Sequence, residues 1–240
     1  MKVGARFARG MAEVPLHRRL QVACFRPDAT RQDLERLCKE ARELGCLGVC
    51  VTPVRVELAA SLLEESEVRV VGLVGFPFGT SQSDVKVLEV ESVIESGARE
   101  VEVVLHPGAL RDGNDRAVLR ELRDVREAAE ERPVTAVVEA GLLTPEEVRR
   151  ACGLVLQAEL QFVATATGCA GRAITQSDLR QLREWVGPEL GLKAVGGIGS
   201  AELARVLVEA GASRVAVLDL SGFRSDGEPV EGASGPSGGG

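Results

Sequence analysis

The chain has no tyrosine, two histidines and one tryptophan, and its six cysteines form no Cys-X-X-Cys motif. Zinc sites need three or four convergent histidine, cysteine or carboxylate ligands, so these absences argue against a metal centre. Most of the cysteines have apolar neighbours, as small buried thiols do. Thiols of this kind fit a reducing compartment, and we expect a cytoplasmic protein.

Long hydrophobic runs are also missing. No segment approaches the about 20 apolar residues that a membrane-spanning helix requires. Residues 1–19 are basic and mixed, without the apolar stretch and small-residue cleavage site of a secretory signal. Their arginines leave a mitochondrial address open, although Glu13 and the scarcity of serine argue against one.

Positive charge is in deficit, since 29 basic residues face 36 acidic ones and the net charge is −7. Nucleic-acid binding depends on clustered lysine and arginine, and anionic membranes attract the same residues. The balance therefore predicts neither a nucleic-acid partner nor a membrane surface.

What the chain does have is 240 residues, 45% of them hydrophobic, which is enough for one well-buried domain. Short β-branched runs alternate with longer amphipathic stretches, and several of the runs are nearly all apolar, as strands covered on both faces must be. The predicted strands are 20–25, 47–52, 68–74, 100–105, 134–139, 160–165, 192–195 and 214–218.

Seven helices separate these runs and carry their own start and stop signals. Thr30 and Thr144 begin capping-box patterns, and Thr175 and Ser200 precede two further helices. Gly45, Gly97 and Gly211 stand where three helices should end.

Eight strands with intervening helices predict a closed parallel (β/α)8 barrel, the TIM-barrel architecture. A doubly wound open sheet is the alternative, but no G-x-G-x-x-G follows the first strand. We expect the barrel to span residues 20–222, with an incomplete last unit. Residues 1–19 offer a covering helix in its place, and the Gly/Pro/Ser-rich residues 223–240 predict a disordered tail.

The strand ends, where such barrels place their active sites, resemble the deoxyribose-phosphate aldolase family. The matching motifs are collinear over about residues 20–218. They are Arg26-Pro-Asp-Ala-Thr30, Val74-Gly-Phe-Pro-Phe-Gly79 with Val85-Lys-Val87, Gly108-Ala-Leu-Arg-Asp-Gly113, Glu139-Ala-Gly-Leu-Leu143 and Lys193-Ala-Val-Gly-Gly-Ile198.

The resemblance implies a reaction, the reversible cleavage of 2-deoxyribose 5-phosphate to glyceraldehyde 3-phosphate and acetaldehyde without a cofactor. In the family a strand-six lysine forms a Schiff base, and a strand-seven lysine beside it depresses its pKa, since like charges disfavour the protonated form. Here the strand-six position is Ala164, the strand-seven lysine is Lys193, and Glu102 replaces the strand-four aspartate. The family's first-strand Asp-His-Thr reads Gln21-Val22-Ala23.

Lys193, Glu102 and Glu139 are the catalytic candidates that remain. Lys193 is either a surrogate Schiff-base lysine or a relic paired with Glu102 or Glu139, which would keep it charged. The two glutamates are either an acid–base pair or structural charges. Cys50 and Cys169 lie toward the barrel mouth, where a buried or merely lining thiol is the simpler interpretation.

Gly171, Arg172, Gly196 and Gly197 are the candidate phosphate-binding residues, because backbone amides and a guanidinium suit a small anion. Asp219 stands in the family's phosphate-binding turn after strand eight, where it would repel a phosphate. We expect a small phosphorylated sugar or another small anion as the partner, with a homodimer or a partner subunit left open.

Two functions are compatible with these residues. One is a barrel of aldolase descent whose chemistry is altered or lost. The other is an active, divergent aldolase or lyase that uses Lys193 on a small aldehyde or sugar phosphate.

Overall fold

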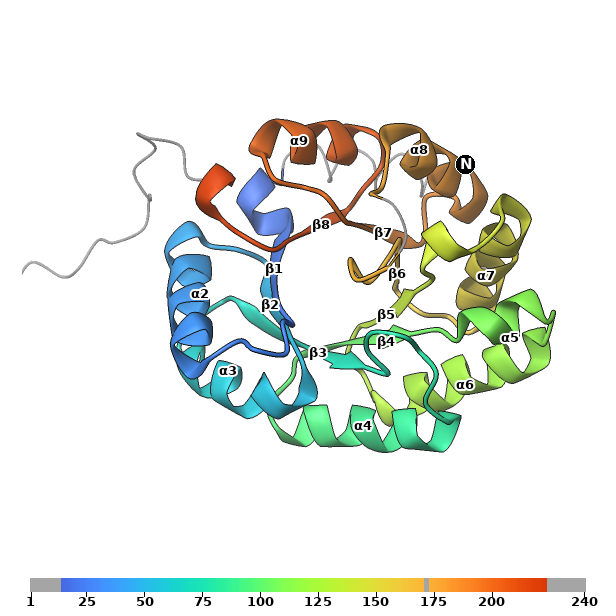
Figure 1. Cartoon of the computed structure of the whole chain (residues 1–240), viewed down its shortest axis with the longest axis horizontal. Coiled ribbons are helices and arrows are strands. Elements are labelled where there is room, and N and C mark those ends of the chain that lie inside the picture. Colours follow the sequence, from blue (N-terminus) through green and yellow to red (C-terminus); the bar gives the residue numbers. More distant parts are fainter. Residues whose placement is uncertain (1–13, 171–172, 224–240) are drawn as a thin grey trace, which may run out of the picture.

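Eight parallel strands close into a barrel in the computed structural model, which describes residues 14–170 and 173–223 (Figure 1). Each strand pairs with the next along the chain, and β1 pairs with β8 to close the ring. The strands are β1 (Leu20–Cys24), β2 (Gly48–Val51), β3 (Arg69–Val74), β4 (Glu100–Val104), β5 (Val134–Val137), β6 (Phe162–Ala164), β7 (Gly191–Val195) and β8 (Arg214–Val217). The predicted closed barrel is confirmed, and most strands are one to three residues shorter than predicted, because residues at one or both predicted ends already belong to the loops.

Seven helices of the described residues surround the barrel, and shorter turns follow several strand ends. The seven are α2 (Arg31–Leu44), α3 (Val56–Leu62), α4 (Ser83–Glu95), α6 (Asp115–Ala128), α7 (Pro145–Gln157), α8 (Gln176–Val186) and α9 (Ala201–Glu209). A short α5 (Pro107–Arg111) follows β4. The 3-10 turns are η1 (Leu16–Arg19), η2 (Pro53–Arg55), η3 (Ala140–Leu142) and η4 (Ser221–Phe223).

The predicted helix boundaries are set by local hydrogen bonds. Thr30 and Thr144 each accept from the amide three residues on, and the carboxylate there accepts from the threonine amide in return. Thr175 forms a third such box, and the Ser200 hydroxyl caps α9. Such caps satisfy amides that the first helical turn leaves unpaired.

Glycine ends three helices as predicted. Gly45, Gly97 and Gly211 all have positive φ, at 67°, 102° and 118°. In each case the glycine amide donates to the carbonyl three residues back, and the next amide donates to the carbonyl five residues back. This pairing is the Schellman arrangement, which requires a conformation that glycine adopts without steric cost.

The predicted terminal segments are only partly described. Residues 14–19 include the turn η1, and after β8 the described part of the chain ends with the turn η4. The rest of the predicted covering segment, residues 1–13, and the predicted tail from residue 224 lie outside the described part of the chain, as do Gly171 and Arg172.

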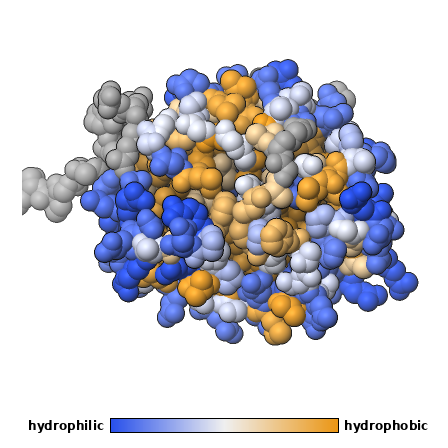
Figure 2. Space-filling view, in the orientation of Figure 1, coloured by the Kyte–Doolittle hydropathy of each residue, from blue (hydrophilic) through white to orange (hydrophobic). Residues whose placement is uncertain are grey.

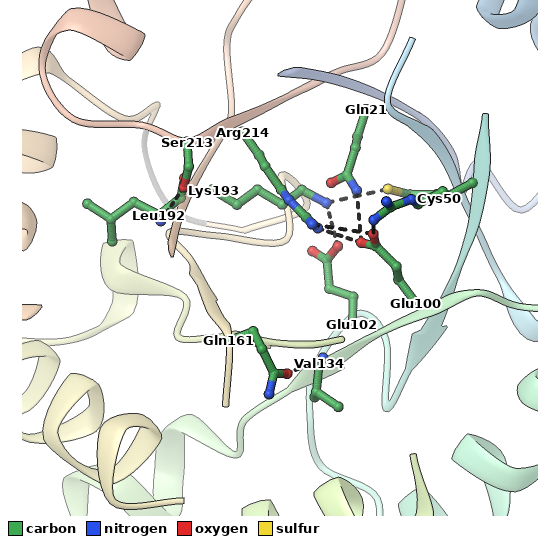
Figure 3. A network of polar contacts seen from close by, with 11 residues as sticks. Gln21, Cys50, Glu100, Glu102, Val134, Gln161, Leu192, Lys193, Ser213 and Arg214 are labelled. Carbon is green, nitrogen blue, oxygen red and sulfur yellow. Dashed lines mark hydrogen bonds and ion pairs between the residues drawn. The ribbon is translucent and has the colours of Figure 1, made fainter. Parts of the chain in front are cut away.

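A buried polar cluster fills the N-terminal end of the barrel, where the strands begin (Figure 3). Glu100 of β4 is 1% exposed and accepts from the guanidiniums of Arg214 and, at 2.7 Å, Arg69. Gln21 of β1 donates to the same carboxylate at 3.4 Å. The Arg214 guanidinium also lies 3.5 Å from the centre of the Phe162 ring. This cluster fills the barrel interior at the end opposite to the carboxyl ends of the strands, where (β/α)8 barrels place their active sites.

Candidate active site

Lys193 and Glu102 form a buried ion pair inside the barrel, one layer above the Glu100 cluster (Figure 3). Both side chains point inward, Lys193 from β7 and Glu102 from β4, and they are 1% and 5% exposed. The Lys193 Nζ also lies 3.4 Å from the Sγ of Cys50 on β2. The structure therefore pairs Lys193 with Glu102, one of the two carboxylates the sequence left open.

The environment of Lys193 favours its charged form. Burial is the largest single influence and lowers the pKa, but the charge and hydrogen bond of Glu102, together with Cys50, outweigh it and the pKa is raised. For the Cys50 thiol burial acts in the opposite direction and raises the pKa to about 11, because it disfavours the charged thiolate. A protonated amine is not a nucleophile, so the pair opposes Schiff-base formation.

An apolar layer separates this pair from the barrel mouth. Val104 and Val195 occupy the next inward positions of β4 and β7, two residues beyond Glu102 and Lys193, and Ala164 lies in the same cluster with no exposed surface. The full cluster is Val104, Val137, Ala164, Ala166, Val195 and Ala216, with Phe76 packed against it. On the face shown in Figure 2, apolar residues gather toward the middle and hydrophilic ones toward the rim.

The segment after β6 turns inward over this layer (Figure 1). A side-chain carbon added at Gly168 would lie 3.7 Å from both Phe25 and Val195, so the backbone there reaches across from β6 to residues that follow β1 and end β7. Phe25 in turn packs on Phe76, with ring centres 5.0 Å apart. The loop therefore lies close to Val195, two residues beyond Lys193, which is itself 1% exposed.

Glu139 belongs to a different network from Lys193 and Glu102. Its carboxylate accepts from the amide of Thr167 at 2.9 Å and from the Thr167 hydroxyl at 2.5 Å. Its side chain is buried, and its backbone is left-handed, with φ 52° and ψ 57°. The two glutamates that the sequence suggested as an acid–base pair thus bind separate partners.

The candidate anion-binding glycines lie at the end of β7. Gly196 and Gly197 have φ of 109° and 71°, which turns the chain sharply before α9. A side-chain carbon at Gly222 would lie 2.4 Å from the Gly199 carbonyl oxygen, so the turn after β8 packs closely on the turn after β7. Within that turn, the Asp219 carboxylate accepts from the amide of Ser221 at 2.7 Å and from its hydroxyl.

A cavity of about 170 Å³ opens between α7 and α8, beside the mouth. Its inner wall is formed by Thr165, Ala166 and Val195, and Trp185 of α8 contributes to its outer part. Neither Lys193 nor Glu102 lines it.

The described residues offer neither a metal site nor a membrane span. No group of three or more histidine, cysteine, aspartate or glutamate side chains there is arranged to hold a metal ion. In the same residues no helix is long and apolar enough to cross a membrane.

Sequence reasoning placed Lys193, Glu102 and Ala164 near the strand ends, where the family has its active site, but it missed the cluster around Glu100. Glu100 and Arg214 are the first residues of β4 and β8, and a charged residue at the start of two strands was the available signal. It also placed Cys50 at the mouth, whereas the thiol lies deeper, against Lys193.

Comparison with known proteins gives one consistent family. Residues 20–225 match the model of the DeoC/LacD family aldolases. A protein named deoxyribose-phosphate aldolase 1 from Bacillus licheniformis is 42% identical over 199 residues, which cover 82% of this chain and 89% of that one. A deoxyribose-phosphate aldolase from Thermococcus gammatolerans is 41% identical over 195 residues, covering 80% and 87%.

Solved structures agree with the sequence comparisons. An aldolase called QR15 superposes with a TM-score of 0.83 at 29% identity, covering 85% of this chain and 92% of that one. The deoxyribose-phosphate aldolase of Aeropyrum pernix gives a TM-score of 0.80 at 27% identity, covering 91% and 94%.

Proposed function

Because the chain belongs to the DeoC/LacD family of aldolases, we propose that it is an aldolase-fold protein whose Schiff-base chemistry is lost or altered, and that it binds a small phosphorylated sugar or another small anion at the barrel mouth. One observation carries this proposal: Lys193 is held by Glu102 beneath an apolar layer that includes Ala164. The six free cysteines are consistent with a cytoplasmic location.

Glu102 and Ala164, the residues that differ from the family at the catalytic positions, both favour a charged Lys193. A pair of lysines lowers the pKa of both, whereas one lysine beside one carboxylate is a neutral, mutually stabilised pair. Lys193 neighbours Ala164 in the β6–β7 register, so a lysine at 164 would bring a second ammonium close to the first. With alanine there, burial lowers the pKa of the remaining amine, but Cys50 and Glu102 raise it and the net shift is upward.

Binding of an anion is proposed for the turns after β7 and β8. Backbone amides in such turns hold phosphate in many barrels. Asp219 opposes this, because its carboxylate already accepts from the amide and hydroxyl of Ser221. We therefore expect weak phosphate binding, and replacing Asp219 with serine should strengthen it by about tenfold, equivalent to about 1.4 kcal/mol.

The test compares the wild-type chain with the Ala164→Lys variant. Each is incubated with 2-deoxyribose 5-phosphate, assayed for glyceraldehyde 3-phosphate, reduced with borohydride and mapped by mass spectrometry. We expect no turnover and no reduced adduct in the wild-type chain, and an adduct at position 164 in the variant. Adding Lys193→Met to the variant should slow adduct formation, since the lysine that lowers the pKa is then gone.

The alternative is an active divergent aldolase that uses Lys193, and the inward direction of this side chain favours it. Wild-type turnover at ordinary enzyme rates, roughly 1 per second or faster, would establish that alternative. So would a reduced adduct on Lys193 that disappears in Lys193→Met. Circular dichroism of each variant ensures that an inactive one is still folded.

A further inference from the structure

We propose that Glu139 is a positioning residue that holds the segment after β6 across the barrel mouth. It lies at the end of β5, outside the Lys193–Glu102 network, and its described side-chain hydrogen bonds all run to Thr167. The proposal builds on the covered lysine of the proposed function, but its test measures the position of a loop and no chemistry.

The hydrogen bonds fix one point of the loop firmly. The same Glu139 oxygen accepts from the amide and the hydroxyl of Thr167, and that hydroxyl accepts from the amide of Cys169 at 3.1 Å. A carboxylate bonded by amide and hydroxyl donors away from water holds its partners more strongly than a neutral acceptor does. One side chain thereby sets the backbone from Thr167 to Cys169.

The position of Glu139 is itself costly to maintain. It is a non-glycine residue in the left-handed region, and its second oxygen, Oε1, is buried without a hydrogen-bond partner among the described residues. Both features are unfavourable and persist where surrounding structure over-determines them. In this structure the Glu139 carboxylate holds Thr167 in place through two hydrogen bonds.

The fixed loop in turn covers the barrel interior. Gly168 comes directly after Thr167 and lies against Phe25 and Val195. Phe25 and Phe76 pack against the buried cluster of Cys50, Val71 and Leu73, and Cys50 contacts Lys193. Releasing Thr167 should therefore uncover Cys50 and Lys193 while leaving the outer ring of helices intact.

Thiol labelling tests this directly, because the chain carries its own controls. Cys50 lies under the loop, Cys169 is exposed, and three further cysteines (Cys38, Cys46 and Cys152) are buried elsewhere. Wild type, Glu139→Ala and Glu139→Gln are treated with iodoacetamide in native buffer and digested, and labelling of each cysteine is quantified by mass spectrometry.

In Glu139→Ala we expect labelling of Cys50 to accelerate at least tenfold while Cys38, Cys46 and Cys152 stay protected. Glu139→Gln should behave nearly as wild type, because its amide oxygen still accepts from Thr167. Thr167→Val, which removes the hydroxyl alone, should give an intermediate increase and serves if Glu139→Ala fails to fold. Glu147→Ala, which breaks the capping box of α7, is the matched control and should leave Cys50 protected.

Two results would overturn the proposal. One is unchanged protection of Cys50 in both Glu139→Ala and Thr167→Val. The other is a parallel rise at all four buried cysteines, since that pattern reports global destabilisation and not a displaced loop. Neither outcome affects the result of the borohydride test, so the labelling experiment can refute this inference without refuting the proposed function.

Discussion

The Lys193–Glu102 pair makes a quantitative prediction, because both charges are almost fully removed from water. Replacing Lys193 with methionine leaves an unpaired carboxylate inside the barrel, and replacing Glu102 with leucine leaves an unpaired ammonium. Removing one partner of a buried pair typically costs about 3–5 kcal/mol. Native domains are stable by only about 5–15 kcal/mol, so either single variant should lose a large part of the total.

The double variant Lys193→Met with Glu102→Leu should recover most of that loss. Replacing a whole buried pair with apolar side chains of similar volume is often neutral or stabilising by about 1–4 kcal/mol. The two single losses would sum to about 6–10 kcal/mol if independent, so the interaction energy in the double-mutant cycle should be about 5 kcal/mol or more.

Urea unfolding followed by circular dichroism measures all four corners of this cycle. The exposed pair Arg31–Glu35, with N–O distance 2.7 Å, is the matched control. Arg31→Ala should change the free energy of unfolding by no more than about 0.5 kcal/mol, because solvent screens such pairs. A Lys193→Met loss below about 1 kcal/mol, or additive losses in the double variant, would refute the claim that two desolvated charges depend on each other.

Three further predictions concern stability. The free energy of unfolding should fall as pH rises from about 9, because the Cys46 thiol has a folded pKa of about 12 and ionises first in the unfolded chain. The slope is up to about 1.4 kcal/mol per pH unit for each such thiol. Urea titrations at pH 8–10.5 measure this slope, and Cys46→Ala should reduce it. Thr144→Ala should cost about 1 kcal/mol by thermal or urea unfolding, and Thr144→Ser should restore most of it. Gly79→Ala should lower the free energy of unfolding by more than about 1 kcal/mol, because Gly79 has a φ of 68° and the new methyl carbon would lie 2.1 Å from the Leu105 carbonyl oxygen. An unchanged urea midpoint would contradict this prediction.

Local patterns determined much of the fold. The β-branched runs that became β3 and β8, the capping box at Thr144 and the glycine at Gly45 each depend on interactions within a few residues, and each was predictable for that reason. The closure of eight such units into one barrel then follows from their number and alternation. The family resemblance also placed Lys193 and Glu102 near the carboxyl ends of their strands, where such barrels have their active sites.

The partner of each side chain depended on distances that no local pattern contains. Ninety-one residues separate Lys193 from Glu102, and the sequence left Glu139 equally available to it. Strand register and barrel tilt brought Glu102 to the amine and Cys50 beside it, whereas the turn after β5 directed Glu139 to Thr167. The sequence thus determined which groups were present and near which strand ends they lie, and the tertiary structure decided their partners, because ion pairing and burial act across the barrel and not along the chain.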